Sequence, residues 1–318
     1  MIEQFILYKQ GLGFKYGEGI QTVLKQLNHQ LNQFEVDTPL LTKNMVMHLS
    51  ERRKPEALTT QSKRISVLKQ LAKFMQLIDL EAYVYPDHYK LIYYDSFSPY
   101  IFSHPEISKV FQIADNLSYC RQSPYRHIIW PAFLRVLYGC GLRLSEGILL
   151  KQTHVDMVKG VLFIEHSKNQ ISRYVPLSKS LHEYLKTYQL LTASLLDKSD
   201  YFFPSYHTLN AYSPGNARTQ IKNIYQAADI SLNHHGRLPR VHDLRHTFCC
   251  HALEQLINKG YDPYYCLPLL STFVGHQTIR DTERYLHLPQ FQYPELTSVG
   301  NDILKNSIRL EETLHENL

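Results

Sequence analysis

Hydrophobic residues recur at helical spacing through most of the first hundred positions of this chain. Apolar residues between 23 and 34 predict one helix, and a second helix in LTKNMVMHLSERR should end before Pro55. A third is expected at about 58–78, with charged residues on the opposite side. Its apolar stripe consists of Ile65, Leu68, Ala72 and Met75.

The helical period is lost in YVYPDHYKLIYYDSFSPY, and a new helical pattern begins near His104. We therefore expect a domain boundary close to Ser96, with an N-terminal helical domain of residues 1–96 and a second domain of residues 97–318. In the second domain, HIIWPAFLRVLYGCG predicts an apolar helix that ends at glycine, and LRLSEGILL predicts a short helix after it. GVLFIEHSKNQISRYVPL predicts two strands around a polar turn. The expected fold class is mainly α with one small β-sheet (α+β).

Composition places the chain among globular proteins, because 44% of residues are hydrophobic and 20% are charged. The N-terminus does not resemble a signal peptide, and no run approaches the roughly 20 apolar residues that span a bilayer, so we expect a cytoplasmic protein without a membrane partner. The five cysteines form no CxxC pair, which argues against a disulfide framework and a cysteine zinc site. We expect them to be reduced and mostly buried.

A net charge of +5 only weakly suggests a polyanionic partner, but basic residues gather between Glu51 and Lys73. A charged face on an isolated helix usually serves solubility. A DNA-handling site elsewhere in the chain would favour phosphate contact instead. The candidate DNA contacts of this patch are Arg52, Arg53, Lys63, Lys69 and Lys73.

Two cations accompany the predicted short helix and the predicted hairpin. Arg143, in GCGLRLSE, follows the hydrophobic helix, and Glu146 lies one turn later, where it can orient the guanidinium. Lys168 lies at the tip of the hairpin, where an ammonium group is usually solvated but can also reach into a bound ligand as a proton donor.

The segment VHDLRHTF raises a choice between a metal and a phosphate. His242 and His246 are one helical turn apart, as in zinc proteases, but Arg245 shares the face of His242. A fixed cation would repel a metal ion, whereas a guanidinium can donate two hydrogen bonds to phosphate oxygens. We therefore favour a phosphate ligand for His242 and Arg245, and expect His246 to have a packing or supporting role.

The last motif, VGHQTIRDTERYLHL, carries His276 and Tyr285. Thr278 and Asp281 have the spacing of a capping box, so a helix should start there and place Tyr285 two turns in.

Taken together, GCGLRLSE, SKNQISRYVPL, HDLRHT and VGHQTIRDTERY resemble, in order and spacing, the signature blocks of the tyrosine recombinase (phage-type integrase) family. The resemblance implies an N-terminal helical DNA-binding domain, a mixed catalytic domain and a covalent 3′-phosphotyrosine intermediate that needs no metal or other cofactor. It implies an active site of Arg143, Lys168, His242, Arg245, His276 and Tyr285, with Glu146 in support.

A site-specific recombinase or transposon integrase is the expected function, acting on a double-stranded DNA site as a homotetramer, with accessory recombination proteins as further partners and a nucleoid-associated location. The alternatives are a topoisomerase or telomere resolvase of the same chemistry, and a DNA-binding regulator that does not cleave. The regulator is disfavoured because none of the six residues is missing. The segment after Tyr285 is expected to contain a terminal helix that docks onto a neighbouring protomer.

Overall fold

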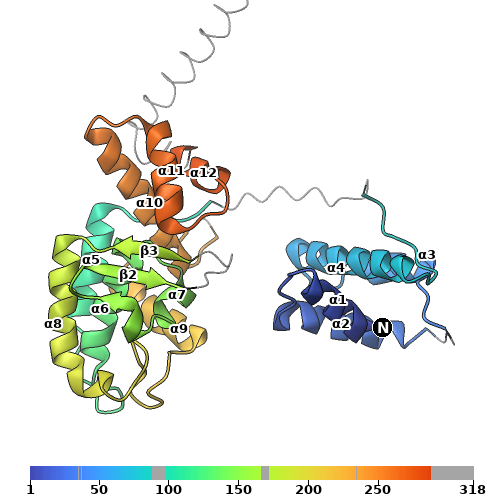
Figure 1. The fold of residues 1–318 in the computed structure, drawn as a ribbon, viewed down its shortest axis with the longest axis horizontal. Coiled ribbons are helices and arrows are strands. Elements are labelled where there is room, and N and C mark those ends of the chain that lie inside the picture. The colour runs from blue at the N-terminus through green and yellow to red at the C-terminus, as the bar shows by residue number, and fades with distance from the viewer. Residues whose placement is uncertain (35, 37, 88–97, 166–171, 234, 288–318) are drawn as a thin grey trace, which may run out of the picture. The chain divides into compact units, whose positions relative to one another are not determined.

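The computed structural model describes residues 1–34, 36, 38–87, 98–165, 172–233 and 235–287 (Figure 1). The chain divides into two compact units, residues 1–97 and 98–318. The predicted terminal helix and Lys168 both lie outside the described residues.

The first unit consists of helices whose apolar faces share one core. Helix α4 packs against each of the other three helices. The predicted stripe is confirmed, because its four residues are at most 7% exposed. The helices are α1 (Ile2–Gly11), α2 (Glu18–Leu31), α3 (Lys43–Ser50) and α4 (Leu58–Leu77).

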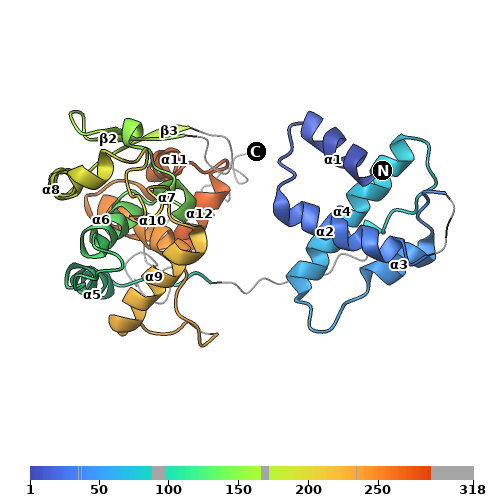
Figure 2. The ribbon, with the colours of Figure 1, turned by 90° about the horizontal axis from the view of Figure 1, so that it is seen from below.

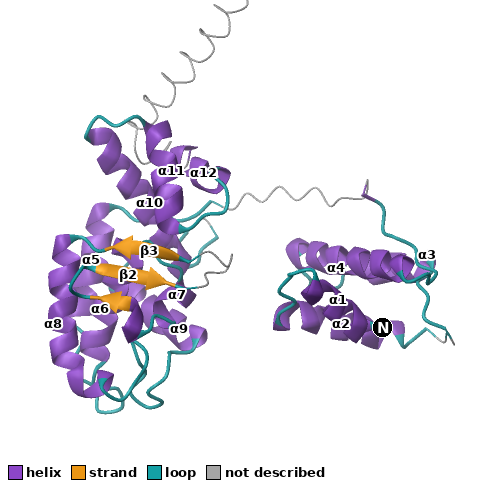
Figure 3. Ribbon diagram, in the orientation of Figure 1, coloured by secondary structure: helices purple, strands orange, loops and turns teal. Residues whose placement is uncertain are grey.

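The second unit is mostly helical and carries one small antiparallel sheet, which confirms the expected fold class (Figure 3). The predicted strands are β2 (Val161–Ile164) and β3 (Arg173–Pro176), with Leu162 opposite Val175. A third strand, β1 (Val155–Asp156), pairs with β2, and its two residues are too few to show an alternating pattern in the sequence.

Four helices of the second unit begin directly after a capping side chain. The side chains of Ser103, Ser178, Ser213 and Asp262 each accept a backbone hydrogen bond in the first turn that follows. The helices are α5 (His104–Asp115), α6 (Arg126–Gly139), α7 (Leu144–Ile148), the 3₁₀ turn η2 (Gln152–His154), α8 (Lys179–Leu196), α9 (Pro214–Ala227), α10 (Val241–Asn258), α11 (Pro263–Val274) and α12 (Arg280–His287).

Helix α6 is the centre of this unit because it is apolar on nearly all sides. It packs against α5, α8 and α10, and Trp130, Phe133 and Leu137 are at most 2% exposed (Figure 2). Leu162 and Val175 contribute the inner face of the sheet to the same core.

Helices α10, α11 and α12 share a second core in which Cys249, Leu270 and Tyr285 are buried. All five cysteines are free, and four of them are buried, whereas Cys120 is half-buried. None of the described helices combines the length and the hydrophobicity that a membrane span requires.

Candidate active site

The turn from α6 to α7 brings Arg143 to the start of α7. Gly141 adopts a φ of 57°, and a β-carbon there would lie 2.4 Å from the Phe248 ring, so both the backbone conformation and the available space require glycine. Arg143 is the N-cap residue, and its backbone N–H donates to Glu146 at 2.9 Å. The predicted orientation of Arg143 by Glu146 is therefore present.

The Glu146 carboxylate is the common partner of three guanidinium groups. It accepts hydrogen bonds from Arg143 Nη1 at 2.8 Å and Arg173 Nη2 at 2.9 Å, and Arg245 Nη1 lies 3.9 Å away. Burial alone would raise the pKa of Glu146, but the hydrogen bonds and charges of the arginines, chiefly Arg173, hold the pKa below its ordinary value. One carboxylate thus holds three cations together and leaves net positive charge.

Arg173, at the start of β3, joins this cluster to the end of α11. Its side chain is 5% exposed, and its Nε donates to the Phe273 carbonyl at 2.8 Å. Gly275 has a φ of 70°, and a β-carbon there would lie 3.1 Å from Arg173. The sequence does not single out Arg173, because an arginine in a strand next to a polar turn is usually a surface residue.

Arg245 lies deepest, with 1% of its surface exposed. Its guanidinium donates to the carbonyls of Gly141 at 2.7 Å and Val274 at 2.5 Å. Burial, followed by the charge of Arg143, lowers the pKa of Arg245 to about 10, so the group remains cationic at neutral pH. Backbone carbonyls from the α6–α7 turn and from the end of α11 therefore fix its position.

The aspartate next to His242 is part of the helix start. Asp243 is 1% exposed and accepts hydrogen bonds from the Arg240 backbone at 2.7 Å and side chain at 2.8 Å. It is therefore a capping residue of α10, and it is not arranged as the base of a metalloprotease. His242 is exposed, and its ring is nearly perpendicular to that of His246, with 4.7 Å between centroids.

Tyr285, on α12, is 1% exposed and hydrogen-bonded to a histidine. His246 Nδ1 lies 2.9 Å from the Tyr285 hydroxyl, and His276 stacks on the tyrosine ring at 6.1 Å between centroids. His276 Nδ1 is also hydrogen-bonded to Thr282 Oγ1 at 2.8 Å. The histidine in direct contact with the predicted nucleophile is thus His246, whose sequence position indicates only a supporting role.

The predicted capping box before Tyr285 differs from the structure. The Thr278 hydroxyl donates to the Asp281 carboxylate at 3.1 Å, and α12 begins at Arg280. The Thr278 hydroxyl is thus a donor to a side chain and does not cap a backbone N–H, and the helix starts one residue later than an N-cap at Thr278 predicts.

One cavity of about 840 Å³ brings most of the predicted residues together. Arg143, His242, Arg245, His276 and Tyr285 all line it. Glu146 does not line the cavity, but its carboxylate accepts a hydrogen bond from Arg143 and so helps to position a guanidinium that does.

Further cations that the motifs do not identify line the same cavity. Arg218 and Lys222 are exposed and four residues apart on α9, so they share one helix face, and Arg240 precedes α10. In the sequence, the four-residue spacing of Arg218 and Lys222 in PGNARTQIKN is the signal that could have identified these two cations.

The basic patch of the first unit is only partly solvent-facing. Lys63 and Lys73 are exposed on α4. Arg52, two residues after the end of α3, is also exposed. Arg53 donates to Gln30, and Lys69 pairs with Asp87. Lys63, Lys73 and Arg52 are therefore the more accessible cations of the five.

The sequence of the chain matches the profile of the Phage integrase family over residues 102–290, more than half of its length. It is 26% identical over 298 residues to the putative integrase/recombinase y4rB of Sinorhizobium fredii, covering 90% of this chain and 91% of that protein. It is 28% identical over 235 residues to the tyrosine recombinase XerC of Oceanobacillus iheyensis, covering 71% of this chain and 69% of that protein.

Solved recombinase structures share the fold. The XerH site-specific recombinase bound to palindromic difH substrate has a TM-score of 0.64 at 19% identity, covering 89% of this chain and 80% of that chain. A lambda integrase dimer bound to a COC′ core site has a TM-score of 0.60 at 15% identity, covering 90% of this chain and 76% of that chain. The chain belongs to the phage integrase family and is a tyrosine site-specific recombinase.

Proposed function

We propose that the cavity holds the scissile phosphate of a double-stranded DNA recombination site and that Tyr285 attacks it. The observation that carries this proposal is the convergence of Arg143, His242, Arg245, His276 and Tyr285 on one cavity wall from separate segments of the chain. Two arginines and the proposed nucleophile line one cavity together with further cations, which suits a phosphodiester.

The chemistry follows from the charges that develop during the attack. The Tyr285 oxygen forms a bond to phosphorus while the bond from phosphorus to the 5′-oxygen breaks, leaving a 3′-phosphotyrosine and a 5′-hydroxyl. Arg143 and Arg245 donate to the nonbridging oxygens as negative charge accumulates on them. These two fixed cations supply the charge stabilisation, so this step uses no metal ion or other cofactor.

Two protons must move in this step. The phenolic proton of Tyr285 leaves through the histidines, with His246 as its immediate partner and His242 beside it. The 5′-oxygen takes a proton from Lys168, a role that rests on the family resemblance. His276, stacked on the tyrosine, donates to a phosphate oxygen. Reversal of the same steps by the 5′-hydroxyl of a second strand completes strand exchange without an external energy source.

The assembly on DNA is the second part of the proposal. Residues 1–96 form a DNA-binding domain that contacts phosphates through its basic patch, residues 97–318 form the catalytic domain, and four copies assemble on paired sites. Related recombinases bound to DNA support the DNA partner: XerH on difH and lambda integrase on its core site. We place the protein in the cytoplasm with the nucleoid, where its substrate lies, and accessory recombination proteins complete the set of partners.

A covalent-trapping experiment tests the proposal. DNA flanking the protein's own gene is nicked so that the short cut fragment escapes, and an SDS-resistant adduct is sought in EDTA with wild type and Tyr285→Phe. An adduct from wild type alone is the expected result. If wild type forms no adduct on DNA that it binds, a non-cleaving regulator of the same fold becomes the better reading. A topoisomerase or telomere resolvase would form the adduct but yield relaxed or hairpin products in place of recombinants.

A further inference from the structure

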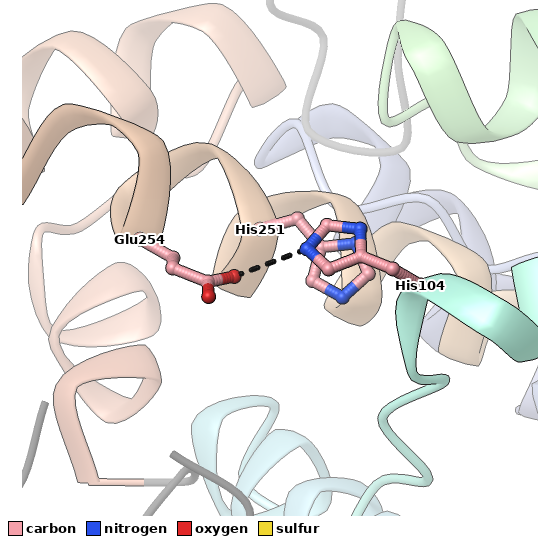
Figure 4. A group of neighbouring side chains, drawn as sticks. All are labelled: His104, His251 and Glu254. Carbon is pink, nitrogen blue, oxygen red and sulfur yellow. Dashed lines mark hydrogen bonds and ion pairs between the residues drawn. The ribbon is translucent and has the colours of Figure 1, made fainter. Parts of the chain in front are cut away.

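A second cluster of polar side chains lies on α10, away from the cavity. His251 and Glu254 are three residues apart on one face of this helix, and His104 is the first residue of α5 (Figure 4). None of the three lines the active-site cavity. His251 is nine residues beyond His242, which is roughly 13 Å along the helix axis.

The geometry of the cluster is close to that of a metal site. Each residue offers one ligand atom, and these atoms lie within 4.8 Å of one another. His104 Nε2 is 3.3 Å from a Glu254 oxygen, and the rings of His104 and His251 are stacked with centroids 3.9 Å apart. Two ligands about 2.0–2.1 Å from one zinc ion lie at most about 4.2 Å apart, so the ligand atoms must move closer together. His104 must also turn out of its stacked position, because a metal ion lies in the plane of each imidazole ring that binds it. The side chain of His104 is 53% exposed and can make this turn.

The environment of His251 suits a ligand. Its Nδ1 is 2.7 Å from the Tyr138 hydroxyl, which gives the ring the kind of outer partner that orients metal-bound histidines. The ring is also hydrogen-bonded to the backbone of Phe102, a bond that a bound ion would replace.

We propose that His104, His251 and Glu254 bind one divalent transition-metal ion of the zinc class, with water completing the coordination. Two imidazoles and one carboxylate are the ligands that such ions accept, whereas Mg²⁺ and Ca²⁺ prefer oxygen ligands alone. The ion joins the start of α5 to the second half of α10, so it stabilises the catalytic domain from outside the cavity. It takes no part in phosphoryl transfer, and its binding does not depend on DNA.

Cobalt and zinc titrations of the full chain without DNA test this site. We expect one Co²⁺ per chain, with visible absorption and no thiolate charge-transfer band, displaced by Zn²⁺. His104→Asn and Glu254→Gln change partly exposed side chains, and each should weaken binding at least about tenfold while circular dichroism stays unchanged. Tyr138→Phe removes the outer partner and should weaken binding by roughly 10–100-fold.

Two histidine variants serve as matched controls. His48 is an exposed histidine 3.9 Å from Glu51 in the other unit, and His242 is the exposed histidine of the cavity. His48→Asn and His242→Asn should bind Co²⁺ as wild type does. Loss of the ion in His242→Asn, a thiolate band, or unchanged affinity in both His104→Asn and Glu254→Gln would overturn the proposal.

Thermal unfolding provides a second readout. A ligand that binds only the folded chain raises the unfolding temperature with its concentration. Zn²⁺ should therefore raise the unfolding temperature of wild type and of His242→Asn, and EDTA should reverse the rise. At the same Zn²⁺ concentration His104→Asn should show a smaller rise, because its binding is weaker, and an equal rise in this variant would place the ion elsewhere.

Discussion

His246 Nδ1 lies 2.9 Å from the hydroxyl of Tyr285, and both side chains are at most 2% exposed. The proposed nucleophile, Tyr285, is therefore held by a buried hydrogen bond before DNA arrives. This bond fixes where the phenolic oxygen points and offers a first acceptor for its proton.

Replacing His246 should consequently impair cleavage. In His246→Gln the amide can fill part of the space but is a poor proton acceptor, so the single-turnover rate of adduct formation should fall by roughly 10²-fold. DNA affinity in gel-shift titrations should remain at the wild-type level, because the His246 side chain lines the cavity but is only 2% exposed. If His246→Gln cleaves at the wild-type rate, His246 does not accept the phenolic proton. His242 would then be the acceptor, and His246 would only pack against the tyrosine.

Arg173 should stabilise the fold through Glu146. In Arg173→Gln the buried carboxylate loses its two hydrogen bonds to this guanidinium, and breaking such a pair costs roughly 3 kcal/mol in free energy of unfolding. Lys186→Gln is the control, because the Lys186 pair with Glu183 is exposed on both sides and should contribute far less to stability. Urea unfolding measures the free energy of unfolding of both variants. An equal loss in the two would show that the buried pair of Arg173 with Glu146 stabilises the fold no more than an exposed pair does.

Acid should weaken the fold through Glu146. Since the pKa of Glu146 in the folded chain lies below its ordinary value of 4.5, the ionised carboxylate stabilises the fold above pH 4.5, and this contribution is lost as the pH falls through the lower folded value. Urea unfolding between pH 6 and 3 should therefore show a steeper loss of stability in wild type than in Glu146→Gln. Parallel curves would mean that Glu146 has the same pKa folded and unfolded.

Gly141 should tolerate no side chain. Gly141→Ala places a β-carbon in a left-handed conformation and against the Phe248 ring, and should destabilise the fold by about 2 kcal/mol or more. It should also slow cleavage, because the Gly141 carbonyl anchors Arg245. Gly11→Ala is the control, since nothing lies within 4 Å of its added carbon, and it should leave thermal unfolding almost unchanged.

The residues that the sequence predicted well are those whose roles follow from local spacing. Arg143 with Glu146, and His242 with Arg245, lie within one turn of each other, so a helical period suffices to pair them. The strands of the hairpin and the apolar face of α4 follow from periodicity in the same way.

The relationships that escaped prediction join distant segments. Arg173 reaches Glu146 across 27 positions, and His246 reaches Tyr285 across 39. Nothing in the local sequence distinguishes these side chains from surface arginines or packed histidines, because their partners are chosen by tertiary packing. His104 and His251, 147 positions apart, are a further case.

Arg218 and Lys222 should contact the DNA backbone next to the scissile phosphate. Both are exposed on one face of α9 and line the same cavity as Arg143 and Arg245. Each phosphate contact releases counterions, so Arg218→Ala and Lys222→Ala should each reduce the slope of log affinity against log salt by about 0.9.

Lys186→Ala is the control, because Lys186 pairs with Glu183 on α8 and does not line the cavity, and its slope should match wild type. Cleavage should remain measurable in both α9 variants at low salt, since neither side chain takes part in the bond changes. If the salt dependence of both variants matches that of wild type, the DNA backbone does not pass over α9, and Arg218 and Lys222 line the cavity without contacting phosphates.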